Sequence, residues 1–168
     1  MITLLLAIIY AAFISLGLPD ILLGAAWPVM EQDLNVPLSF GGLLFMIISC
    51  GTILLSDKIT RRLGAGLVTA ISVGLTAMAL FGFSISRNYA QLCLMAVPFG
   101  LGAGAIDAAL NNYVALHYKA RHMNFLHCFW GIGTIISPLV MGAYIEHGGI
   151  WTDGYKAIAY FQFVLVGI

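Results

Sequence analysis

Two carboxylates in apolar surroundings are the most chemically informative residues of this 168-residue chain. Asp20 and Asp107 each follow a glycine three residues earlier, Gly17 and Gly104, in segments too hydrophobic for a water-soluble helix. A charge at the centre of a membrane costs about 2.5–3.5 kcal/mol on insertion scales, so such residues usually serve a function. A carboxylate in a low dielectric also takes up a proton more readily than one in water. The pattern predicts a site for a solute or a coupling ion between membrane helices.

Other side chains at helical spacing extend this hypothesis. Asn111 lies four residues after Asp107 and therefore on the same helical face. Amide, imidazole and indole groups can bond to, or lie flat against, a polar solute such as a sugar. Packing and hydrogen bonding between helices are the alternative for each of them. We predict that Asp107 and Asp20 couple transport to protons and that the solute-binding residues are Asp20, Asn111, His127, Trp27 and Trp130.

The composition excludes several classes of protein. The chain is 61% hydrophobic and 8% charged, with a mean hydropathy of +1.01, whereas soluble domains have about 25% charged residues. The lipid bilayer is therefore the expected surrounding. The formal net charge of zero argues against a nucleic-acid partner. We find no metal-ligand spacing, HExxH motif, nucleophile elbow or phosphate loop, so neither a cofactor nor an enzymatic activity is expected.

Apolar segments follow one another along the whole chain. Because about 20 helical residues cross the ~30 Å hydrocarbon layer, the sequence predicts an all-α, polytopic membrane protein with one bundle over residues 1–168. The last span covers only ~21 Å at 1.5 Å per residue and is expected to be incomplete. The predicted spans are 2–30, 40–55, 63–84, 90–116, 124–144 and 155–168.

Basic residues mark one side of the membrane. The connections 56–62 and 117–123 contain Lys and Arg, whereas 31–38 and 146–154 contain neither. Because cationic loops stay in the cytoplasm, we predict a multi-pass protein of the plasma membrane with a cytoplasmic N-terminus.

The first and fourth spans share a short pattern. The spacing of Gly17 and Asp20 recurs in Gly104 and Asp107. In transporters, a repeat of three helices in opposite direction places the binding site at the repeat interface. The match predicts a 3+3 inverted repeat, although a chance match in a glycine-rich chain is the alternative.

Several motifs resemble those of the major facilitator superfamily. Residues 57–62 are similar to its loop signature of Asp, a basic residue, any residue, Gly and two basic residues, except that Thr60 replaces the glycine. Residues 102–111 and 124–133 resemble the fourth and fifth helices of the fucose permease group of proton-linked sugar carriers, in which an acid is followed four residues later by Asn. The resemblance implies alternating access, the N-terminal half of a twelve-helix carrier, and a missing C-terminal six-helix half as partner. It also implies a cytoplasmic gating loop formed by Asp57, Arg61 and Arg62.

The resulting hypothesis is H⁺-coupled symport of a sugar or a similar small polar solute. A drug/H⁺ antiporter of the same superfamily, sodium as the coupling ion, and a non-transporting membrane assembly fragment are the alternatives. The chain itself is expected to be a fragment, a truncated product or a self-associating half.

Overall fold

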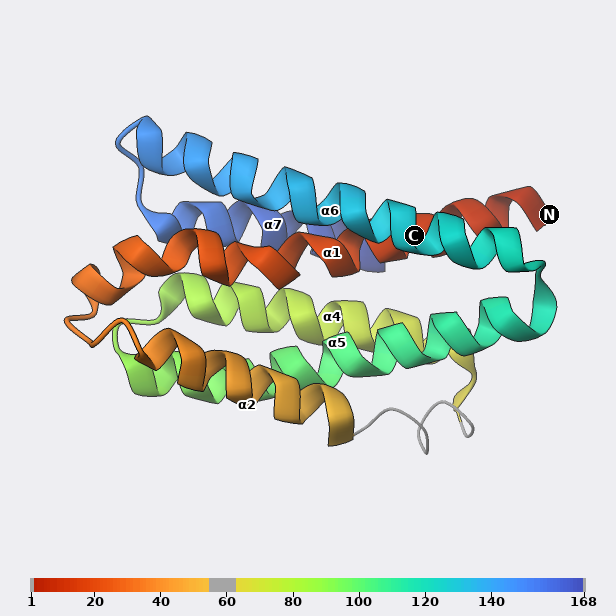
Figure 1. Ribbon diagram of the computed structural model, residues 1–168, viewed down its shortest axis with the longest axis horizontal. Helices are drawn as coiled ribbons and strands as arrows, with labels where there is room; N and C mark the ends of the chain where they lie inside the picture. The colour runs from red at the N-terminus through yellow and green to blue at the C-terminus, as the bar shows by residue number, and fades with distance from the viewer. Residues whose placement is uncertain (1, 55–62, 168) are drawn as a thin grey trace.

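The computed structural model describes residues 2–54 and 63–167 and forms an all-α bundle (Figure 1). The helices run side by side along one axis, so the predicted fold class is confirmed. Asp57, Arg61 and Arg62, predicted for the gating loop, lie outside the described residues. The helices are α1 (Ile2–Asp33), α2 (Phe40–Leu54), α4 (Ala65–Ile85), α5 (Tyr89–His117), α6 (Ala120–Glu146) and α7 (Trp151–Val166).

Four of these helices, α1, α4, α5 and α6, are long and apolar enough to cross a membrane, and α2 is a shorter apolar helix. Two helices begin before the membrane spans predicted for them, α6 at Ala120 ahead of the span 124–144 and α7 at Trp151 ahead of the span 155–168. In both cases the first turn of the helix precedes the apolar segment and makes a polar contact with a residue of α1. The hydroxyl of Tyr10 lies 2.8 Å from Nδ1 of His122, and Nε1 of Trp151 donates to Oδ2 of Asp33 at 2.7 Å.

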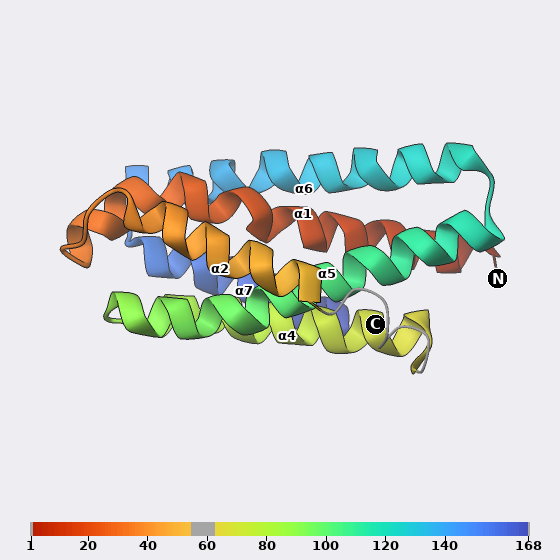
Figure 2. The same ribbon diagram turned by 60° about the horizontal axis from the view of Figure 1, so that its bottom comes forward.

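The helix pairing has the symmetry of an inverted repeat. α1 packs mainly on α6 and α2 on α5, while α4 packs on both α5 and α7; Figure 2 shows α6 along α1 and α2 along α5. The first three helices are α1, α2 and α4, and the last three are α5, α6 and α7. Exchanging each of the first three with its counterpart in the last three converts the α1–α6 pair into the α5–α2 pair. The direction of each helix reverses in this exchange, as the predicted 3+3 arrangement requires.

Glycines set the closest approaches between these helix pairs. A Cβ atom on Gly17 would overlap the main-chain oxygen of Trp130 on α6, and one on Gly104 would overlap that of Thr52 on α2. Small residues of this kind let membrane helices pack backbone to backbone. The two glycines that precede the carboxylates therefore occupy corresponding contacts in the two repeats.

A buried polar contact joins three helices behind α1. Nε2 of Gln162 on α7 donates to the main-chain oxygen of Ser15 on α1 at 2.8 Å. Its Oε1 accepts from Oγ1 of Thr76 on α4 at 3.1 Å. Gln162 and Thr76 are both buried, so this contact fixes one face of α1 against α4 and α7. The opposite face of α1 remains available for the candidate solute site described below.

Candidate solute site

A cavity of about 480 Å³ lies between α1, α2, α5 and α6. Four of the predicted site residues line it together, although they lie on three different helices. Its lining consists of Phe13, Leu16, Asp20, Thr52, Ala103, Gly104, Asp107, Ala108, His127 and Trp130.

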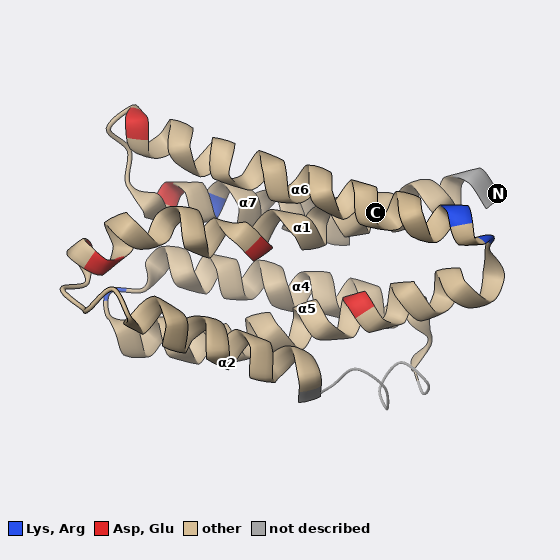
Figure 3. Cartoon of the chain, viewed as in Figure 1, with Lys and Arg blue, Asp and Glu red and all other residues tan. Residues whose placement is uncertain are grey.

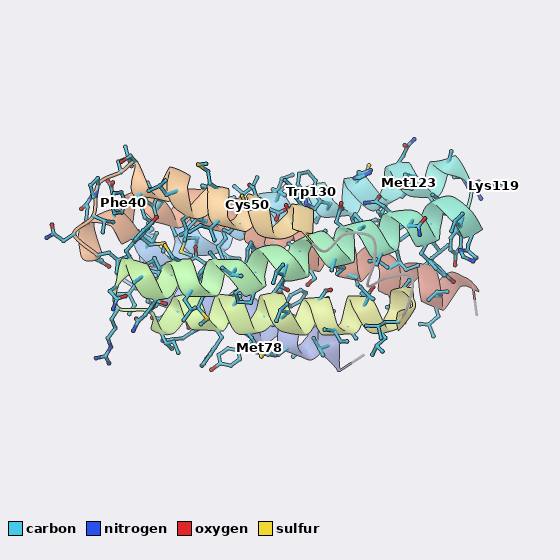
Figure 4. All side chains as sticks on the ribbon, turned by 90° about the horizontal axis from the view of Figure 1, so that it is seen from below. Phe40, Cys50, Met78, Lys119, Met123 and Trp130 are labelled. Atoms are coloured by element: carbon cyan, nitrogen blue, oxygen red, sulfur yellow. The ribbon has the colours of Figure 1, made fainter. Side chains whose placement is uncertain are left out.

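The cavity lies part-way along the bundle. Figure 4 labels Trp130 near the middle of the long axis, with Phe40 toward one end and Lys119 at the other. Figure 3 shows acidic positions part-way along α1 and α5, and Asp107 is the only acidic residue of α5. Charged groups at this depth need polar partners or water, because hydrocarbon offers them neither.

Asp20 is held by a neighbouring helix. Nε1 of Trp130 on α6 donates to its Oδ2 at 2.7 Å, and the Asp20 side chain is half-buried. The close α1–α6 contact at Gly17 brings the two residues within reach. A hydrogen bond to a carboxylate is roughly twice as strong as one between neutral groups, so the Asp20 side chain has a defined orientation at the cavity wall.

Asp107 is held within its own helix. Nδ2 of Asn111 donates to Oδ1 of Asp107 at 2.9 Å and to its main-chain oxygen at 3.0 Å. Asp107 itself is exposed on the cavity side. Asn111 is not part of the cavity lining. The structure thus places Asn111 as a residue that orients Asp107, rather than beside the space for a solute.

His127 completes the polar part of the wall. It lies one turn from Trp130 on α6, and its exposed imidazole meets the Phe13 ring edge-on, with centroids 6.2 Å apart and planes at 83°. The ring can donate and accept hydrogen bonds. The cavity therefore presents two carboxylates, one imidazole and one indole in a wall that is otherwise apolar except for Thr52.

Trp27 lies elsewhere, contrary to the sequence-based interpretation. Its side chain is 5% exposed, and its Nε1 donates to the main-chain oxygen of Leu38 at 2.9 Å. A Cβ atom on Gly41 would overlap the indole, so the start of α2 lies directly against it. Trp27 shares a helical face with Asp20, but the α1–α2 connection covers that face and buries the ring in the core.

Thr52 also belongs to the site, although its position in the sequence did not predict it. It lines the cavity from α2, and its hydroxyl donates to the main-chain oxygen of Ser49 at 2.7 Å. The available signal was a polar residue directly after Gly51, in a span otherwise almost entirely apolar. That signal is weak because a threonine hydroxyl is easily satisfied within its own helix.

Comparison with known proteins agrees with this architecture. The sequence profile of the Major Facilitator Superfamily matches residues 3–168. The chain belongs to this superfamily. The six helices of the described residues form a major facilitator half-domain, as the sequence motifs predicted.

Individual members of the superfamily are distant in sequence. The chain is 22% identical over 161 residues to the glucose/mannose transporter GlcP of Bacillus subtilis (strain 168), covering 93% of this chain and 40% of GlcP. It is 28% identical over 164 residues to synaptic vesicle glycoprotein 2C of Rattus norvegicus, covering 89% of this chain and 22% of that protein. The chain thus spans less than half the length of these relatives.

Proposed function

We propose that this major facilitator half-domain forms one wall of a carrier for H⁺-coupled symport of a sugar or a similar small polar solute. The observation that carries the proposal is that Asp20 on α1 and Asp107 on α5 line one cavity, together with His127 and Trp130. Carboxylates that meet in a cavity at membrane depth are typical of proton and substrate pathways.

The two carboxylates have different surroundings, which supports different roles. Asp20 accepts a hydrogen bond from Trp130 and is fixed in place to accept further bonds from solute hydroxyls. Asp107 is the more exposed of the two, and its one side-chain hydrogen bond within the described part of the chain comes from Asn111. We assign the transported proton to Asp107, because neutralising this group removes the charge that otherwise opposes closure of the cavity.

The open side of the cavity supports a two-half carrier. Asp107 and His127 line the cavity and are nevertheless exposed, so the described helices do not cover them. In the proposed carrier a second six-helix half covers this side, and alternating access consists of rocking the two halves about the fixed site. Lys119 lies in the α5–α6 connection and Arg121 in the first turn of α6, at the same end of the bundle as the N-terminus (Figure 1), which supports a cytoplasmic N-terminus in the plasma membrane.

Uptake by the full-length carrier in proteoliposomes tests the function. The name of the B. subtilis relative makes glucose and mannose the first solutes to try. We expect an inward proton gradient to drive accumulation of a labelled sugar, and replacement of sodium by choline to leave it unchanged. Loss of uptake in choline would assign the coupling to sodium instead. Gradient-driven export of a cationic dye, with no sugar uptake, would favour a drug/H⁺ antiporter.

A further inference from the structure

A second, smaller chamber lies behind Asp20. Its volume is about 210 Å³, and it is bounded by α1, α2, α4, α5 and α7. Asp20 and Thr52 line both this chamber and the central cavity. The two spaces therefore adjoin at these side chains, and a molecule bound to Asp20 has access to both.

The chamber has an exposed mouth and a buried floor. Ser49 and Phe45 line it from α2, where both are exposed. At the other end, Leu80, Phe83 and Tyr155 are each 1% exposed. The chamber thus extends from an accessible edge at α2 into the core of the bundle.

The floor contains one polar atom that lacks a partner. The hydroxyl of Tyr155 is fully buried and has no hydrogen-bond partner among the residues that the structure describes. A hydroxyl that is buried without a partner is destabilising, because it has lost its hydrogen bonds to water. The Tyr155 ring is held in place because it packs edge-on against the rings of Phe83 and Trp151. The distances between ring centroids are 5.5 Å to Phe83 and 5.9 Å to Trp151. The residue that lines the floor of the chamber therefore carries a hydroxyl that the described helices leave without a hydrogen-bond partner.

The chemistry of the lining selects the kind of group that fits. One water occupies roughly 30 Å³ in the liquid, so the chamber is large enough for an organic substituent. Phe83, Phe99 and Tyr155 supply an aromatic floor, and aromatic rings prefer edge-to-face or offset contacts with one another. A flat aryl group with one hydroxyl at its far end satisfies both the floor and the Tyr155 hydroxyl.

From this arrangement we infer that the chamber is a subsite for an aryl substituent on the solute, with the Tyr155 hydroxyl bonding a polar group at the tip of that substituent. The inference rests on the proposed sugar transport: the sugar ring lies in the central cavity at Asp20, and the aglycone of an aryl glycoside enters the chamber. The carrier then prefers aryl glycosides to the free sugar.

Three probes test the subsite on the full-length carrier: glucose, phenyl β-glucoside and para-hydroxyphenyl β-glucoside. Inhibition of radiolabelled glucose uptake gives an apparent affinity for each, and thermal stabilisation of the purified carrier gives a second value that does not require transport. In the wild type we expect both glucosides to bind more tightly than glucose. We expect the para-hydroxyl group to raise the apparent affinity roughly threefold to tenfold over that of phenyl β-glucoside, as one additional hydrogen bond would.

Substitutions separate the hydroxyl contact from the space. Tyr155→Phe keeps the ring and should remove the advantage of the para-hydroxyl group. Tyr160→Phe, on the same helix with its side chain 58% exposed, is the matched control and should retain that advantage. Ser49→Phe narrows the mouth from an exposed position and should lower the ratio of aryl glucoside to glucose affinity at least tenfold.

The outcomes distinguish the subsite from the function on which it rests. Glucose uptake with no preference for either aryl glucoside, or a para-hydroxyl advantage that persists in Tyr155→Phe, would overturn the subsite and leave sugar transport standing. Thermal stabilisation by the glucosides with the expected Tyr155→Phe loss, but no glucose uptake, would support the subsite and contradict sugar transport. The absence of both glucose uptake and thermal stabilisation would overturn the subsite and the proposed sugar transport together.

Discussion

The indole N–H of Trp130 donates a 2.7 Å hydrogen bond to Oδ2 of Asp20, beside the point where the Trp130 main chain lies against Gly17. One residue of α6 therefore sets both the spacing between two helices and the orientation of a carboxylate. Any change in the α1–α6 packing should therefore alter the orientation of the Asp20 carboxylate. The arrangement of these two helices is in this way coupled to the chemistry of the cavity.

Trp130→Phe should lower transport without unfolding the protein. The substitution keeps an aromatic ring but removes the donor to Asp20, and a hydrogen bond to a charged group contributes about 1.5–3 kcal/mol. We expect a solute KM roughly tenfold or more above that of the wild type, measured as initial uptake rates in proteoliposomes.

Trp27→Phe is the matched control for this prediction. It also removes one indole donor, but that donor bonds to the main-chain oxygen of Leu38 in the α1–α2 connection. It should lower the thermal stability and leave KM near the wild-type value. Equal KM effects of the two substitutions would show that the bond to Asp20 has no special role in solute binding.

Gly17→Ala and Gly104→Ala should each disrupt a helix pair. A Cβ atom at either position would overlap a main-chain oxygen of the neighbouring helix, which cannot move as a side chain can. Overpacking typically costs about 1–3 kcal/mol, so we expect lower unfolding temperatures in detergent and weaker transport. Gly24→Ala on α1, where the added atom meets nothing within 4 Å, should be nearly neutral. A destabilising Gly24→Ala would imply a general effect of glycine replacement in α1.

Asn111→Ala should change the pH dependence of uptake through Asp107 without removing a solute contact. Asn111 donates to the Asp107 carboxylate at 2.9 Å but does not line the cavity. We expect the pH profile of uptake to shift while the solute KM changes by less than about threefold. The adjacent Asn112, an exposed residue, gives the control substitution Asn112→Ala. A large KM change with an unshifted pH profile would instead assign Asn111 to solute binding.

Gln162→Leu should weaken the contact of α7 with α1 and α4. The substitution removes the donor to the Ser15 main chain and the acceptor for Thr76. Hydrogen bonds between membrane helices are worth about 0.6–1.7 kcal/mol, so the expected loss of unfolding free energy is of that order. Thr76→Val should cost less, because it removes one of these two bonds between helices and leaves the bond from Gln162 to Ser15 in place. The opposite ranking in chemical denaturation would contradict the role given to Gln162.

The sequence predicted those features that the membrane itself imposes. Long apolar segments in a bilayer must form helices, so an all-α bundle followed from hydropathy, and carboxylates within apolar segments are costly, so Asp20 and Asp107 were identifiable. The recurrence of a glycine three residues before each acid also predicted the repeat. The structure gives the physical reason: Gly17 and Gly104 occupy equivalent helix contacts.

Other features depend on contacts between distant segments and were not visible in the sequence. Trp27 shares a helical face with Asp20, but the α1–α2 connection covers it. Asn111 has the spacing of a cavity residue, yet a partner within its own helix takes up its amide. Thr52 and Tyr155 belong to helices whose patterns are mainly apolar, and only the packing of five helices brings them next to Asp20.

The most direct test measures two kinds of transport in the same proteoliposomes containing the full-length carrier, either wild type or Asp107→Asn. Accumulation driven by a proton gradient requires a group that takes up and releases the proton, whereas exchange of labelled for unlabelled solute at equal pH does not. We predict that Asp107→Asn abolishes gradient-driven accumulation and retains exchange. Accumulation by Asp107→Asn equal to that of the wild type would contradict the assignment of the coupling proton to Asp107.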